Sequence, residues 1–171
     1  MAPLMFLIGT FTAFYLVDRY LLGGRVTLSF RGRFSMAVML LVTGIAHFVM
    51  ADQMTTMFPD FVPFKRELVY FTGLCELAAV LGLTWVRFSR LTSITLIVFF
   101  IAVLPANIFD ALKGPELGGF GHGPAYLFIR IPEQILYIWW VWFFGIHLKE
   151  QRQDGGSLFG DKQEALVGQG H

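Results

Sequence analysis

Charged residues are scarce in this chain, and their scarcity excludes most soluble proteins. Only 15% of the 171 residues are charged, against about 25% in a typical soluble domain. The mean hydropathy of +0.63 and the hydrophobic fraction of 56% point in the same direction. A net charge of +1 supplies no basic surface for nucleic acid, so nucleic acid is not an expected partner. The composition predicts an integral membrane protein whose main partner is the lipid bilayer.

Cysteine is nearly absent as well, because Cys75 is the only one. A single thiol excludes an internal disulfide and a dithiol relay within one chain. The sequence has no HxxxH or CxxC spacing, so we predict no metal site. A membrane haem needs paired axial ligands at matching depth. His47 and His147 fall near opposite membrane faces and do not meet that condition.

Long apolar runs are abundant. They cover Pro3–Leu22, Phe34–Met50, Glu67–Val86, Leu91–Leu112 and Pro124–Leu148. Each is close to the roughly 20 residues that cross a bilayer as a helix. The predicted fold class is therefore all-α, a polytopic membrane bundle with five transmembrane helices. We expect one transmembrane domain at 1–150, with its core at 34–148. The polar, glycine-rich residues 151–171 are expected to form a flexible cytoplasmic tail.

The distribution of arginine predicts the orientation of the bundle. Arginines occur in the first and third connections, at Arg25, Arg31, Arg33, Arg87 and Arg90. If five helices alternate, both connections and the C-terminal tail fall on one side of the membrane. Positive charge in short loops marks the cytoplasmic side. We therefore expect the N-terminus outside, the C-terminus in the cytoplasm, and residence in the cytoplasmic membrane of a bacterium.

The last apolar run begins with the sequence RIPEQ, which a purely lipid-facing helix would not contain. Arg130 and Glu133 lie among apolar neighbours, and a central arginine alone costs roughly 2.5–3.5 kcal/mol on an insertion scale. The helix must therefore turn these groups toward other helices. Arg130, Gln134 and Tyr137 share one face at helical spacing, and Glu133 lies beside them.

Three other runs carry polar groups at comparable depth. His47 lies near the outer end of the second run, Glu76 inside the third, and Asn107 near the end of the fourth. Alternation of the helices puts all of them in the outer half of the membrane. We therefore predict one polar pocket, open to the outer face and lined by four helices. Glu76 is the expected counter-ion of Arg130, with Glu133 as the competing partner.

Two prolines add unpaired backbone groups to this region. Pro105 and Pro132 each remove a helical hydrogen bond and free the carbonyl four residues earlier, at Ile101 and Phe128. A free carbonyl in lipid needs a donor. We expect the arginine, histidine or asparagine of the pocket to supply it.

Five short motifs resemble the DoxX-like family of small membrane proteins. They are GIAHF at 44–48, FPDFVP at 58–63, GLCELAAVLGL at 73–83, PAN at 105–107 and RIPEQ at 130–134. The resemblance covers roughly residues 34 to 142. It implies a four-helix membrane bundle, to which the N-terminal helix and the tail would be additions. Members of that family are linked to quinone-reducing thiosulfate oxidation and to a membrane oxidoreductase complex in oxidative-stress defence.

The first functional hypothesis is an accessory subunit of a membrane redox system that handles a quinone-like lipid. The catalytic pair would be Glu76 as proton carrier and His47 as its route to the outer face. The ligand-binding residues would be Arg130, Asn107, Gln134, Glu133 and Tyr137. No residue of the chain holds electrons, so a partner redox protein or a soluble donor is required. The cofactor expected is a quinone, held without a covalent bond.

Two other hypotheses use the same residues. The chain could be a non-catalytic scaffold or assembly factor that docks another membrane protein. It could instead bind, transport or isomerise a small apolar lipid. The polar groups could also serve only to hold the helices together, as polar side chains do in many membrane bundles. A homo-oligomer is compatible with each hypothesis.

Overall fold

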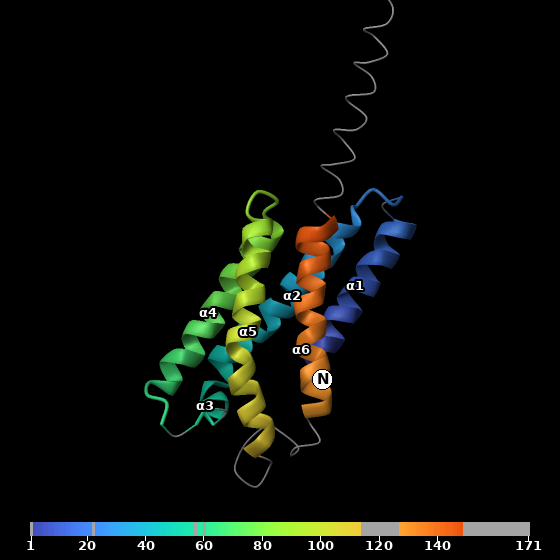
Figure 1. Ribbon diagram of the computed structural model, residues 1–171. Helices are drawn as coiled ribbons and strands as arrows, with labels where there is room; N and C mark the ends of the chain where they lie inside the picture. Colours follow the sequence, from blue (N-terminus) through green and yellow to red (C-terminus); the bar gives the residue numbers. More distant parts are fainter. Residues whose placement is uncertain (1, 22, 57, 60, 114–126, 149–171) are drawn as a thin grey trace, which may run out of the picture.

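The computed structural model describes residues 2–21, 23–56, 58–59, 61–113 and 127–148, and over these residues the chain is all-α, without β-strand (Figure 1). The helices are α1 (Ala2–Tyr20), α2 (Leu28–Val49), α3 (Ala51–Thr55), α4 (Lys65–Thr84), α5 (Ser89–Lys113) and α6 (Leu127–Trp142), the last continued by a π-helical turn, Phe143–His147. The predicted fold class is confirmed at this level. The predicted tail at 151–171 and the start of the last apolar run lie outside the described residues.

Among the described residues, three helices are long and apolar enough to cross a membrane, namely α2, α4 and residues Ser89–Phe109 of α5. Their outer faces carry large apolar side chains, including Phe71 and Leu81, which are 63% and 69% exposed. A soluble monomer rarely exposes contiguous apolar surface of this kind. These features indicate a membrane protein. The other two runs form helices whose length and composition alone do not place them across a membrane.

The start of α2 differs from the prediction. The apolar run begins at Phe34, whereas the helix begins at Leu28, because the Thr27 hydroxyl accepts a hydrogen bond from the Phe30 backbone N–H at 3.4 Å and caps the helix. Arg31 and Arg33 therefore lie in α2, and their assignment to the first connection was wrong. The cap residue determines where a helix begins, and the hydrophobic pattern used to predict the helix does not reveal which residue is the cap.

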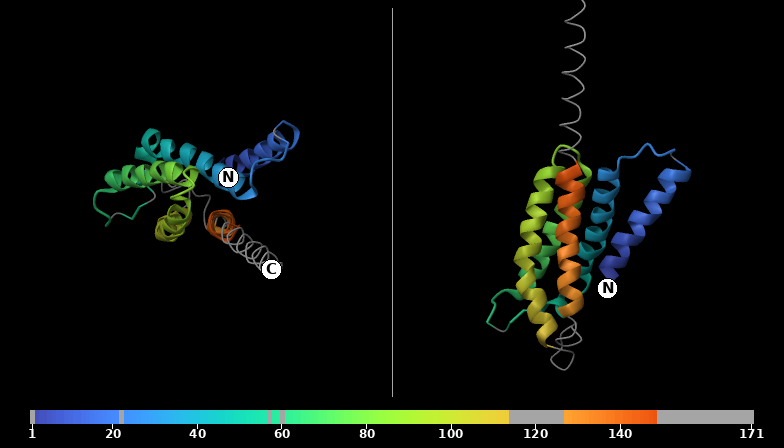
Figure 2. Two further views of the ribbon diagram at one scale, coloured as in Figure 1. Left: turned by 90° about the horizontal axis from the view of Figure 1, so that it is seen from above. Right: turned by 45° about the vertical axis from the view of Figure 1, so that its right-hand side comes forward.

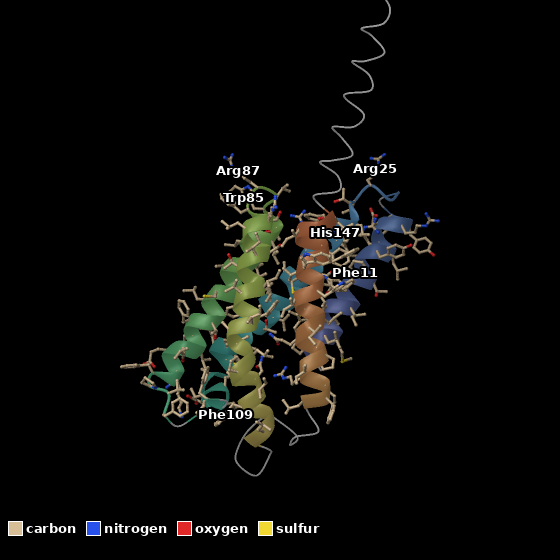
Figure 3. All side chains as sticks on the ribbon, viewed as in Figure 1. Phe11, Arg25, Trp85, Arg87, Phe109 and His147 are labelled. Carbon is tan, nitrogen blue, oxygen red and sulfur yellow. The ribbon has the colours of Figure 1, made fainter. Side chains whose placement is uncertain are left out.

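The long helices run alternately up and down (Figure 1). Seen from above, α5 and α6 lie on one side of the pair formed by α2 and α4 (Figure 2). Arg25 and Arg87 lie at one end of the bundle, which we call the basic end, and Phe109 lies near the other (Figure 3). His147 also lies toward the basic end (Figure 3). The alternation that the prediction required is therefore present.

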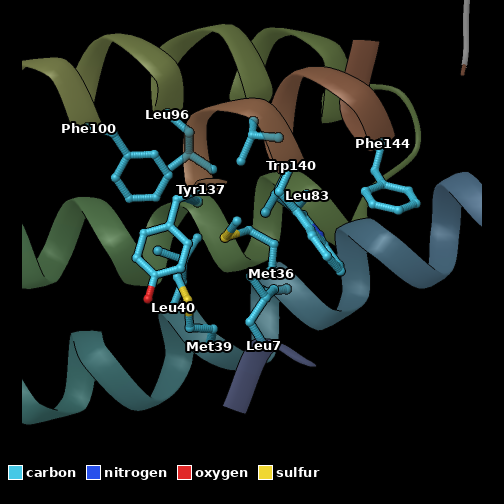
Figure 4. Close-up of a cluster of buried hydrophobic side chains, with 13 residues drawn as sticks. Leu7, Met36, Met39, Leu40, Leu83, Leu96, Phe100, Tyr137, Trp140 and Phe144 are labelled. Atoms are coloured by element: carbon cyan, nitrogen blue, oxygen red, sulfur yellow. The ribbon is translucent and has the colours of Figure 1, made fainter. Parts of the chain in front are cut away.

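One hydrophobic core joins the helices, and α1 takes part in it. Leu7 of α1 is fully buried, together with Leu40 of α2 and Leu83 of α4 (Figure 4). Phe11 packs edge-on against Trp140 of α6, with ring centroids 5.0 Å apart. Although the predicted core began at residue 34, the N-terminal helix covers part of the same apolar cluster.

Candidate functional site

Two glycines lie against each other where α2 crosses α4. A Cβ atom added to Gly73 would lie 2.6 Å from the His47 Cβ and 3.2 Å from the Gly44 carbonyl oxygen. One added to Gly44 would lie 3.3 Å from the Gly73 carbonyl oxygen. A Cβ at Gly73 has no room and one at Gly44 would be tight, so the two helices approach closely here. This contact brings together the polar residues that lie within one helical turn of the two glycines.

Those neighbours are Thr43, His47 and Glu76, which we call the α2–α4 centre. The Thr43 hydroxyl donates a hydrogen bond of 2.6 Å to Glu76 Oε2. His47 Nδ1 lies 3.7 Å from the same oxygen and 2.8 Å from the Thr43 carbonyl oxygen. Glu76 is only 8% exposed. Because Thr43 belongs to α2 and Glu76 to α4, their hydrogen bond connects two helices.

The His47 imidazole is the more accessible group of this centre and lies near the C-terminal end of α2. A hydrogen bond from His47 Nδ1 to a carbonyl oxygen places a proton on that nitrogen. In the neutral ring Nε2 is then an acceptor. The side chain of His47 is 19% exposed, whereas the side chain of Glu76, taken without its backbone, is 10% exposed. Chemically, the centre can hold a proton on a buried carboxyl group and exchange it through a more accessible imidazole.

A second set of contacts, the α5–α6 centre, consists of Asn107, Gln134 and the Phe100 carbonyl. Gln134 Nε2 donates to the Phe100 oxygen at 2.8 Å, and Asn107 Nδ2 donates to Gln134 Oε1 at 3.4 Å. Phe100 is one residue before Ile101, whose helical donor Pro105 removes. The glutamine therefore bonds the carbonyl next to the one that Pro105 frees, and the expected donor to the Ile101 carbonyl itself stays a prediction.

A third set, Arg130, Glu133 and Tyr137, lies on α6 alone, and we call it the α6 carboxylate cluster. The Tyr137 hydroxyl donates to Glu133 Oε1 at 2.7 Å, and Arg130 Nη1 lies 3.5 Å from Glu133 Oε2. Glu133 is 4% exposed, and its Oε2 accepts no hydrogen bond from the described residues. Both described partners of Glu133 belong to its own helix. Their contacts with it do not join α6 to a neighbour.

The prediction for α6 is confirmed in its main point. Glu133, Gln134 and Tyr137 are buried, whereas Phe128 and Ile135 of the same helix are exposed. The helix therefore turns its polar side toward the bundle and its apolar side outward. This arrangement keeps the polar groups away from the apolar outer face of the helix.

The seven predicted site residues fall into these three groups, and the expected pairing of Glu76 with Arg130 was wrong. Arg130 pairs instead with the competing partner, Glu133. The glycine contact directs Glu76 toward α2, where Thr43 meets it. Glu133 is one helical turn from Arg130 and is therefore close to it however α6 is rotated.

The apolar core adjoins both carboxylate groups. The Tyr137 ring packs against Phe100, with centroids 5.9 Å apart, and belongs to the same buried cluster as Met39 and Leu40 (Figure 4). Leu40 is one helical turn from Thr43 of the α2–α4 centre. An apolar molecule held at this cluster could therefore have polar groups of two centres as neighbours.

Sequence reasoning missed Thr43. Threonine inside a helix usually bonds its own backbone, and Thr43 also lies 3.2 Å from the Met39 carbonyl oxygen. The available signal was spacing, since Thr43 and His47 are four residues apart and share one helix face. The sequence also gave no indication that the Trp140 indole N–H donates to the Gly32 carbonyl of α2 at 2.9 Å.

Comparison with protein families gives one match, a domain of unknown function (DUF8561), over residues 36–145. No curated protein and no solved structure is similar enough to match. The matched range contains all three centres and most of α2. The chain belongs to the DUF8561 family.

Proposed function

We propose that this DUF8561 member is an integral protein of the cytoplasmic membrane with five membrane-spanning helices. Three apolar helices and the up-and-down course of the chain support this proposal. The shared location of Arg25 and Arg87 supports a cytoplasmic basic end, with the N-terminus outside (Figure 3). Under this orientation the α6 carboxylate cluster and His47 lie in the outer half of the membrane.

The function we propose is binding of a quinone-like lipid, as the accessory subunit of a membrane redox system. The observation that carries it is the burial of Glu133 among partners of its own helix. A buried ionisable group in a membrane is costly. The α2–α4 and α5–α6 contacts join helices, and that role accounts for their burial. The described contacts of Glu133 do not serve this role, so a ligand is the better explanation.

Each group has a distinct part in the proposed chemistry. Arg130, whose side chain is 23% exposed, donates to a carbonyl oxygen of the ligand and orients it. Glu133 and Tyr137 form the polar wall beside it, next to Gln134 and Asn107. Glu76 and His47 carry protons between the ligand and the outer face. Electrons come from a partner redox protein, as the resemblance to the DoxX-like family also implies.

The test is native mass spectrometry of the protein released from its own membrane in nanodiscs. Wild type should retain a small molecule with the mass of a quinone, and Arg130→Met and Glu133→Gln should lose it. Glu76→Gln is the matched control, because it neutralises the other buried carboxylate without touching the proposed binding residues. It should keep the ligand and slow quinone reduction by membranes.

Other outcomes identify the competing hypotheses. A retained sterol-like or other lipid in place of a quinone would indicate binding or isomerisation of an apolar lipid. A second protein bound equally to wild type and all variants, with no small molecule, would indicate a scaffold. Either result would overturn the proposed quinone function.

A further inference from the structure

Arg33 is a buried cation without an acidic partner among the described residues. It is 6% exposed and lies in the second turn of α2. Its Nε donates to the Ser29 carbonyl at 3.3 Å and its Nη1 to the Leu83 carbonyl at 3.4 Å. These bonds use two of the five guanidinium N–H donors. Two carbonyl dipoles do not neutralise a buried charge, which is costly unless an anion pairs with it.

Arg31, two residues earlier, is a comparable arginine that does have an acidic partner. Its Nη2 lies 3.0 Å from Asp18 Oδ2. Asp18 is almost fully buried and also accepts a hydrogen bond from the Val26 backbone N–H at 3.1 Å. Arg31 therefore has a carboxylate supplied by the chain. Arg33 lies two residues further along the same helix, and no carboxylate of the described residues pairs with it.

A surface depression begins next to the residue that Arg33 contacts. It is lined by Thr84, Trp85, Val86 and Arg87, and holds about 690 Å³. Leu83, whose carbonyl accepts from Arg33, directly precedes Thr84. Arg87 and Trp85 are exposed at this basic end (Figure 3). Arg87 thus lines the depression, and the carbonyl that Arg33 contacts belongs to the residue directly before its first lining residue.

We propose that this depression binds the phosphate of an anionic phospholipid between Arg33 and Arg87. Basic pockets at the ends of membrane helices bind such headgroups, and tryptophan prefers the headgroup level. The acyl chains would lie on the outer face of α4, where Leu74 and Leu81 are 60% and 69% exposed. This adjoining apolar face is the reason for assigning a phospholipid rather than a free phosphate ion.

The experiment uses the full chain in nanodiscs that contain equal amounts of phosphatidylglycerol and phosphatidylcholine. Native mass spectra of the ejected protein report which lipid it retains. Wild type should keep phosphatidylglycerol in preference to phosphatidylcholine, and Arg87→Gln should reduce that preference about fivefold, from the loss of one arginine–phosphate contact. Arg33→Gln should reduce it at least as much. If Arg33→Gln does not fold, Arg87→Gln decides the test.

Arg25→Gln is the matched control, because it removes a positive charge at the same end from a residue that does not line the depression. It should leave the preference unchanged. An equal loss in Arg25→Gln would show general attraction to a basic surface and would overturn the site. Thermal stabilisation by inorganic phosphate in phosphatidylcholine discs, without retention of phosphatidylglycerol, would overturn the assignment to a lipid.

Discussion

The two buried carboxylates of this bundle are held in different ways. Glu76 accepts its short hydrogen bond from Thr43 on another helix, whereas Glu133 is held by Tyr137 and Arg130 of its own helix. The first arrangement lowers the free energy of the folded bundle, because it exists only when α2 and α4 are packed. The second can form in α6 by itself. A polar group that folding does not require is the stronger candidate for binding a ligand.

The largest expected effect comes from separating α2 and α4 at their glycine contact. Gly73→Ala should lower the free energy of unfolding by about 1–3 kcal/mol, because the added Cβ would overlap the His47 Cβ and approach the Gly44 backbone. A denaturant titration in mixed micelles measures this change. Gly9→Ala is the matched control, since its Cβ would meet nothing within 4 Å. Equal effects at both glycines would contradict the close contact.

A double-mutant cycle sharpens the contrast at Glu76 itself. Thr43→Val and Glu76→Leu each remove the hydrogen bond and should destabilise the bundle, and their coupling energy should be about 0.6 kcal/mol and no more than about 1.7, the range for hydrogen bonds between membrane helices. The same titration on the four proteins gives the coupling. Strictly additive effects would show that the 2.6 Å contact contributes nothing to the association of α2 with α4.

The apolar runs predicted the long helices and the polar side of α6, because both follow from local spacing. The partners of the charged groups were harder to predict. Whether Glu76 meets Arg130 or Thr43 depends on how α4 is rotated about its axis, and the contact between Gly44 and Gly73 determines that rotation. Nothing in the sequence indicates that Gly44 of one apolar run contacts Gly73 of another. The first turn of α2 was missed because it depends on the cap at Thr27.

An intermediate effect is expected where α6 contacts α5. Gln134→Leu removes the donor to the Phe100 carbonyl and leaves that oxygen buried without this partner. The expected loss is about 1 kcal/mol of unfolding free energy. Thermal unfolding followed by size-exclusion chromatography measures it, with Ile135→Leu on the exposed side of the same helix as control. A Gln134→Leu protein as stable as that control would argue that the bond between α5 and α6 adds nothing to folding.

The smallest effect on stability should come from Glu133→Gln. The amide oxygen can still accept from Tyr137, and the lost ion pair with Arg130 is a contact within one helix, worth about 0.5 kcal/mol at most. Arg130 does not become a fully buried unpaired charge, because its side chain is 23% exposed. The free energy of unfolding should therefore change by no more than about 0.5 kcal/mol, while retention of the small molecule falls. A Glu133→Gln protein as unstable as Gly73→Ala would mean that the α6 carboxylate cluster supports the fold after all. The distinction between a carboxylate that joins helices and one that faces a ligand would then be lost.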